Sequence, residues 1–212
     1  MRQFSFFDRL CNVADSALKT TFGVYDAQTR ANPAANIEQP ELSEQQSRHA
    51  ASLMRINHTG EVCAQALYQG QALTAKLPDI RQEMEQAAKE EVDHLAWCSE
   101  RIKELDSRES LLNPLWYAGS FTIGAIAGLA GDKWSLGFVA ETEQQVGKHL
   151  ESHLDKLPEQ DHKSRAILKQ MHQEELQHAA NAIHHGAAEL PKPIKSAMGL
   201  MSKVMTKSVY YI

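Results

Sequence analysis

A single glutamate followed by a Glu-x-x-His motif occurs twice in this chain, with a spacing of 30 residues in one copy and 32 in the other. A glutamate from each of two helices, with a Glu-x-x-His from each of two more, is the ligand set of di-iron carboxylate four-helix bundles. Residues three apart on a helix are neighbours on one face, so both side chains of the motif reach one site. The pattern predicts a centre for two metal ions with six candidate ligands: Glu61, Glu91, His94, Glu143, Glu175 and His178.

Helical geometry places the four glutamates of this set inside apolar stripes. At about 100° per residue, the sector around Glu143 also holds Val139, Val146 and Leu150, and the other three glutamates have similar neighbours. Four buried carboxylates would repel one another, and each would lose its hydration. Two divalent cations would balance the four charges, while two neutral imidazoles would complete the set of ligands.

Three nearby glutamates point elsewhere on the same helical wheels. Glu90 and Glu174 are rotated by about 100° from the apolar stripes, and Glu141 by about 160°. We therefore expect these three side chains to face solvent and to take no part in the site. A single helical glutamate is most often solvated, whereas two matched sets are specific to a metal centre.

The ligand chemistry favours iron or manganese, because the set is rich in oxygen and contains no thiolate. No His-Glu-x-x-His motif is present, so the signature of a zinc protease is missing. His149 could orient a ligand from behind or have no role, and Tyr68 could be a core residue or a polar neighbour of the metals. The remaining histidines of interest are expected on exposed helix surfaces: His162, His172, His184 and His185.

Length and composition allow one globular domain with short extensions. The chain has 212 residues, of which 42% are hydrophobic and 23% charged, and its net charge of −5 gives no basic surface for nucleic acid. Three widely spaced cysteines argue against a disulfide framework and for a reducing compartment. The N-terminus lacks the apolar run of a signal peptide and the Arg and Ser bias of a transit peptide.

The hydrophobic periodicity predicts an all-α fold. The repeated ligand set indicates a ferritin-like four-helix bundle, with an additional apolar helix at a membrane interface between the two halves of the bundle. Residues 1–42 are expected to form an amphipathic segment and a linker, 43–190 the bundle, and 191–212 a segment on the membrane surface. A capping box at Ser43–Gln46 is expected to open the first long helix, and Pro78 to end it. Further helices are expected over about 79–106, 111–131, 132–157 and 159–190.

The stretch 111–131 contains no charged residue and is long enough to span a bilayer. It lies between the two halves of the ligand set, so a spanning helix would put them on opposite sides of the membrane. We therefore expect it to dip into one leaflet, with Trp116, Tyr117 and Trp134 at the interface. The alternative is a buried core helix followed by a disordered C-terminal tail.

Several motifs resemble the demethoxyubiquinone hydroxylases of ubiquinone biosynthesis, and the likeness covers roughly residues 45–212. The matching segments are Asn57-His58-Thr59-Gly60-Glu61, Glu91-Val92-Asp93-His94, Asn113-Pro114-Leu115-Trp116, Thr142-Glu143 and Glu174-Glu175-Leu176-Gln177-His178. Members of the family often have Asp where this chain has Asn57, which leaves the ligands unchanged.

The resemblance implies two iron ions per chain. Glu61, Glu91 and His94 would bind one, Glu143, Glu175 and His178 the other, and Glu91 and Glu175 would be the candidate bridges. It implies hydroxylation, with O2, of a polyprenylated methoxy-benzoquinol ring in the lipid phase, by a peripheral protein on the cytoplasmic face of the cell membrane. The sequence contains no Gly-x-Gly-x-x-Gly motif of its own for a nicotinamide or flavin, so an external electron donor is expected. A partner protein that presents the lipid and a homo-oligomer are both left open.

Two other functions fit parts of the pattern. The first is a ferritin-like or rubrerythrin-like iron oxidase or peroxidase, although the apolar stretch has no use in a soluble cage. The second is a non-enzymatic carrier of quinone or lipid, which would bind no stoichiometric iron.

Overall fold

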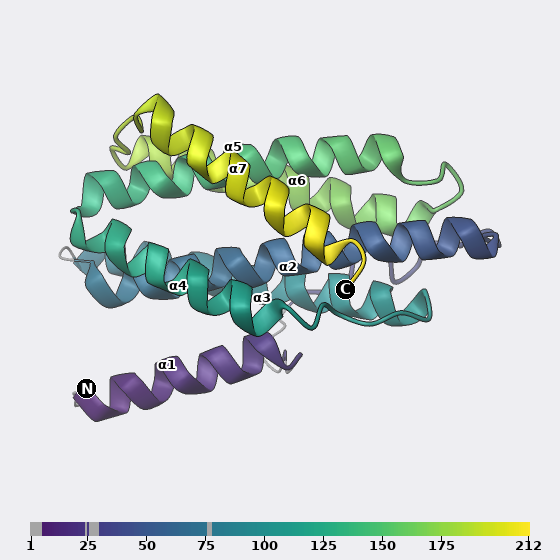
Figure 1. Cartoon of the computed structure of the whole chain (residues 1–212), viewed down its shortest axis with the longest axis horizontal. Coiled ribbons are helices and arrows are strands. Elements are labelled where there is room, and N and C mark those ends of the chain that lie inside the picture. The colour runs from purple at the N-terminus through teal and green to yellow at the C-terminus, as the bar shows by residue number, and fades with distance from the viewer. Residues whose placement is uncertain (1–5, 24, 26–29, 76–77) are drawn as a thin grey trace.

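The computed structural model describes residues 6–23, 25, 30–75 and 78–212, and over these residues it is all-helical (Figure 1). The helices of this described part are α1 Phe6–Thr21, α2 Glu44–Thr74, α3 Pro78–Glu104, α4 Asn113–Leu129, α5 Asp132–Lys156, α6 His162–His184 and α7 Lys192–Val209.

The ends of the long helices follow from local sequence signals. The predicted capping box is confirmed, because Ser43 Oγ accepts from the Gln46 backbone N–H and the Gln46 side chain accepts from the Ser43 N–H. α6 begins later than expected, at His162, because Asp161 caps it by accepting from the Ser164 N–H. α6 also ends earlier than expected, at His184. Gly186 follows with a φ of 91°, which is incompatible with continuing the helix.

Two helical pairs form the bundle. α2 packs along α3 and α5 along α6, and the pairs meet through contacts of α2 with α5 and of α3 with α6. Along each of the four helices, the candidate ligands lie between two hydrophobic clusters. One cluster contains large side chains such as Leu53, Trp97 and Leu168, and the other is rich in alanine around Tyr68 and Leu136. The helices therefore enclose the candidate ligands between two apolar layers.

α4 lies unusually close to α2. A Cβ added to Gly70 would be 2.3 Å from the Phe121 carbonyl oxygen, and one added to Gly124 would be 2.3 Å from the Leu67 carbonyl oxygen. Glycine removes the side chains that would otherwise hold these two helices apart. Gly124 and Gly128 of the apolar stretch thus serve a helix–helix contact, and the opposite face of α4 exposes large apolar side chains at Leu115, Ile126 and Leu129.

α7 crosses the bundle on the same side as α4 (Figure 1). It contacts α2 and α5, and Lys195 Nζ lies 3.2 Å from Glu141 Oε2, so Glu141 pairs with α7 and does not simply face solvent. Tyr117, expected at an interface, is instead buried and donates a hydrogen bond to Gln69, whereas Trp134 is exposed. Among the described helices, none combines the length and apolar character needed to cross a bilayer.

Candidate metal centre

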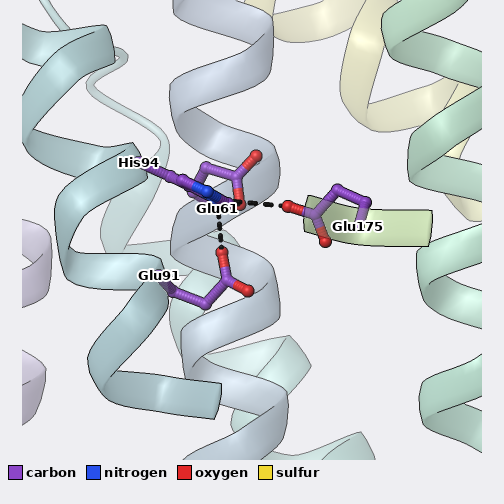
Figure 2. Close-up of side chains that lie close together, drawn as sticks. All are labelled: Glu61, Glu91, His94 and Glu175. Carbon is purple, nitrogen blue, oxygen red and sulfur yellow. Dashed lines mark hydrogen bonds and ion pairs between the residues drawn. The ribbon is translucent and has the colours of Figure 1, made fainter. Parts of the chain in front are cut away.

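The six candidate ligands lie together in two groups. The first contains Glu61, Glu91, His94 and Glu175, whose side chains converge from α2, α3 and α6 (Figure 2). The second contains Glu143, Glu175 and His178, from α5 and α6. Within each group the ligand atoms lie within 4.8 Å of one another, and Glu175 belongs to both groups.

Glu91 and Glu175 each lie near both histidines. His94 Nδ1 is 3.1 Å from Glu91 Oε2 and 3.1 Å from Glu175 Oε1, while Glu61 Oε2 is 3.8 Å away. His178 Nδ1 is 3.4 Å from Glu91 Oε1 and 3.5 Å from Glu175 Oε2. These two carboxylates are therefore central, and Glu61 and Glu143 flank them.

Several buried polar atoms of the cluster make no hydrogen bond. They are Glu91 Oε1, Glu143 Oε2, both carboxylate oxygens of Glu175, and His178 Nδ1. Buried polar atoms are nearly always satisfied, and leaving one unpaired costs about 1–3 kcal/mol. Divalent cations would use these atoms as ligands, so the residues fit a pair of metal ions.

The carboxyl groups of the cluster differ in proton affinity. Burial, reinforced by the charges of Glu91 and Glu175, raises the pKa of Glu61. Burial and the charge of Glu175 do the same for the pKa of Glu143. Burial also opposes ionisation of Glu91, but the charge of His94 and contacts with both histidines more than offset it, so the pKa of Glu91 is lowered. Burial and the charge of Glu91 oppose ionisation of Glu175, but contacts with Glu143, His178 and His94 outweigh them, so the pKa of Glu175 is lowered.

The two histidines are shifted in the opposite direction from ordinary buried imidazoles. Burial disfavours their charge, but nearby carboxylates, chiefly Glu91 for His94 and Glu175 for His178, raise both pKa values above the usual range. Without metal ions, these directions favour protons on the two histidines and on the outer carboxyls, Glu61 and Glu143. Metal ions would displace these protons.

Each histidine is held from outside the cluster by a glutamate of the opposite motif. The Nε2 atom of His94 is 2.6 Å from Glu174 Oε2, and that of His178 is 2.8 Å from Glu90 Oε2. With Nδ1 directed at the carboxylate cluster, Nε2–H donates outward, which is the usual support for a metal-binding histidine. The expectation that Glu90 and Glu174 take no part in the site is therefore wrong, because each crosses to the facing helix.

Arg30, which precedes the bundle, completes one of these supports. Its Nη1 is 2.5 Å from Glu174 Oε1, and its Nε is 2.5 Å from Asp93 Oδ2. The guanidinium also lies over the ring of Trp97, 5.0 Å from the centroid. Arg30 lies in the linker, where no helical periodicity points to it. Glu90 and Glu174 did have a sequence signal, because both motifs read Glu-Glu-x-x-His.

The remaining predicted neighbours lie around the cluster. Tyr68 donates a hydrogen bond to Glu143 Oε1. His149 lines a cavity, and its ring centroid is 3.9 Å from that of His153. That His149 orients a metal ligand stays a prediction. His162, His184 and His185 are exposed and His172 is half-buried.

An apolar cavity of about 480 Å³ reaches the cluster at Glu61. Its walls come from α2, α4, α5 and α7, including Leu67, Trp116, Phe138 and Met201. Asn57 also lines it, and Asn57 Nδ2 is buried without a hydrogen bond. A second cavity of about 90 Å³ lies against His178 and Glu90.

Comparison with known proteins gives consistent matches. The family model described as "Ubiquinone biosynthesis protein COQ7" matches residues 48–209. A protein of Acinetobacter baylyi named 3-demethoxyubiquinol 3-hydroxylase is 58% identical over 212 residues, covering 100% of both chains. Proteins of the same name from Ectopseudomonas mendocina and Acinetobacter baumannii are 59% and 56% identical over 211 and 212 residues; the alignments cover 100% of this chain and 98% and 100% of those proteins.

Proposed function

Because this chain belongs to the family of ubiquinone biosynthesis protein COQ7, we propose that it hydroxylates the ring of a polyprenylated methoxy-benzoquinol. The reaction would convert a demethoxyubiquinol to a demethylubiquinol. One atom of O2 enters the ring, and the other leaves as water with two electrons from an external donor and two protons. The observation that carries this proposal is the buried Glu–His cluster at the inner end of an apolar cavity.

We assign the cluster to two iron ions. Glu61, Glu91 and His94 would hold one and Glu143, Glu175 and His178 the other, with Glu91 and Glu175 as bridges. The contacts of these two carboxylates with both histidines, and the unpaired oxygen atoms of Glu175, support the assignment. When bound, the irons supply the redox chemistry that activates O2, and the protein supplies charge balance and a dry pocket.

The cavity is the proposed quinol site. Its walls exclude water and hold the ring against the α2 turn that carries Glu61. Binding sites of this kind combine apolar walls with a few polar groups that fix orientation. The unpaired Asn57 Nδ2 is the donor we assign to a ring oxygen.

A membrane surface is the proposed source of this substrate. α4 and α7 both line the cavity, and both expose large apolar side chains, including Leu115 and Leu129 on α4 and Leu200 and Val204 on α7. Lys203 and Lys207 lie on the same α7 helix and suit anionic headgroups. We propose that the chain is a ferritin-like bundle. These two helices would attach it peripherally to the cytoplasmic face of the cell membrane.

The experiment is product analysis in a strain that lacks this chain. Accumulation of a demethoxy-quinone, reversed by the wild-type chain and not by Glu143→Gln or Glu175→Gln, is the expected result. No accumulation would return the function to iron oxidation or peroxide removal. Less than one iron per chain after anaerobic reconstitution would instead favour a quinone or lipid carrier.

A further inference from the structure

Among the residues that the structure describes, the linker before the bundle contacts the His94 half of the candidate metal centre, through Arg30. On one side, Glu174 supports His94 and is itself held by Arg30 Nη1 at 2.5 Å and by Gln170 Nε2 at 2.6 Å. On the other side, Glu90 supports His178 and accepts a hydrogen bond from Gln86 Nε2, at 2.9 Å on the same helix α3. The side chain of Glu174 is 20% exposed and that of Glu90 is 39% exposed.

Arg30 connects three parts of this half. It bridges Asp93, which neighbours His94 in α3, to Glu174 in α6, and it covers the Trp97 ring. Trp97 in turn packs on His94, with 5.4 Å between ring centroids. The planar guanidinium thus fixes the facing surfaces of α3 and α6 by two charged contacts in different directions, a geometry that lysine does not reproduce.

We propose that Arg30 is a positioning residue that makes the His94 half the tighter of the two metal sites, so that the centre loads its ions in order. The inference rests on the proposed di-metal function. Arg30 acts through Glu174: it holds that carboxylate against His94 Nε2, which fixes the imidazole with Nδ1 toward Glu61, Glu91 and Glu175. Residues that orient a ligand from behind typically change metal affinity by about 10- to 100-fold.

The test is an anaerobic titration of the full-length, metal-free chain with Co(II), whose visible absorption reports each ion as it is bound. Wild-type chain is expected to bind two ions in two resolved steps. In Arg30→Gln the tighter step weakens at least about 10-fold, while the weaker step moves by less than about twofold. Arg30→Lys is expected to fall closer to Arg30→Gln than to wild type.

Arg48→Gln is the matched control. Arg48 makes an exposed ion pair with Glu44 on α2, far along the chain from the ligands, so the same substitution there is expected to leave both steps unchanged. The double variant Arg30→Gln/Glu174→Gln is expected to bind no more weakly than Glu174→Gln alone, because Arg30 acts through that carboxylate. Additive losses in the double variant would overturn this route.

Equal weakening of both steps, or of neither, in Arg30→Gln would also overturn the proposal. Failure of the wild-type chain to bind two ions would instead overturn the di-metal function. The two failures are therefore distinguishable. Thermal unfolding of each metal-free variant separates a loss of fold from a loss of affinity.

Discussion

The two halves of the Glu–His cluster repeat in sequence but differ in surroundings. His94 is fully buried, with Trp97 on its ring and Arg30 behind its supporting glutamate. His178 is 10% exposed and lies against the smaller cavity. The larger apolar cavity reaches the His94 half, through Glu61. A repeated motif thus supplies the candidate ligands of both halves, while residues outside the motif enclose the His94 half and leave the His178 half more open.

The largest expected effect comes from the carboxylate that both halves share. Glu175 belongs to both groups, so Glu175→Gln should lower iron content to below one per chain and abolish measurable hydroxylation. The loss of metal affinity should exceed the roughly 100-fold limit that is typical when a residue supporting a ligand is replaced. Iron analysis after anaerobic reconstitution, beside Glu61→Gln and Glu143→Gln, measures it. If Glu175→Gln keeps one tightly bound iron, the halves do not share this residue.

Removing one supporting glutamate from each half compares them directly. Glu174→Gln should weaken one metal by about 10- to 100-fold, because it loses a carboxylate fixed by Arg30 and Gln170. Glu90→Gln should affect the other metal and by less, since Glu90 is more exposed and its hydrogen bond more hydrated. Metal titration of the two variants under one buffer gives the ratio. Identical losses would remove the asymmetry.

Filling the larger cavity should act on the quinol and spare the metals. A Cβ at Gly60 would meet nothing within 4 Å, so Gly60→Leu adds a side chain to open space in the cavity wall. We expect the KM for the quinol to rise about 10-fold, as loss of roughly 1.4 kcal/mol of binding would give, with iron content unchanged. Gly60→Ala, a better helix former, is the control for the backbone. An unchanged KM in Gly60→Leu would place the quinol elsewhere.

The smallest expected effect concerns a histidine outside the carboxylate cluster. Burial, and then the charge of His149, lowers the pKa of His153 to about 2, opposite in direction to the shifts of His94 and His178. The unfolded chain takes up this proton below about pH 6.5 and the folded chain does not, so stability is present above that pH and declines as the pH falls. The decline is at most about 1.4 kcal/mol per pH unit.

Urea unfolding at about pH 7.5 and pH 5.5 measures this dependence. His153→Gln, which keeps a donor for Asn57 Oδ1, should show a shallower decline than wild type. The same slope in both chains would mean that His153 is not the group responsible.

The helices and the six candidate ligands were predictable because both depend on periodicity along a single helix. The structure brings together the six residues that the repeated pattern of a glutamate and a Glu-x-x-His selected. Glu90 and Glu174 were misassigned because a helical wheel gives a direction relative to one axis and not what the facing helix presents there. Arg30 was missed for a related reason, since it belongs to no periodic element. The early end of α6 depends on Gly186, whose left-handed conformation the apolar pattern alone does not reveal.

The glycine contact between α4 and α2 has a mechanical consequence. Gly70 and Gly124 let the two helices touch backbone to backbone, so α4 has little freedom to tilt or lift independently of the helix that carries Glu61. If α4 rests on lipid as proposed, the depth of the metal centre beneath that surface is set by helix packing and not by a loop. The distance between the lipid surface and the reacting atoms would then stay constant.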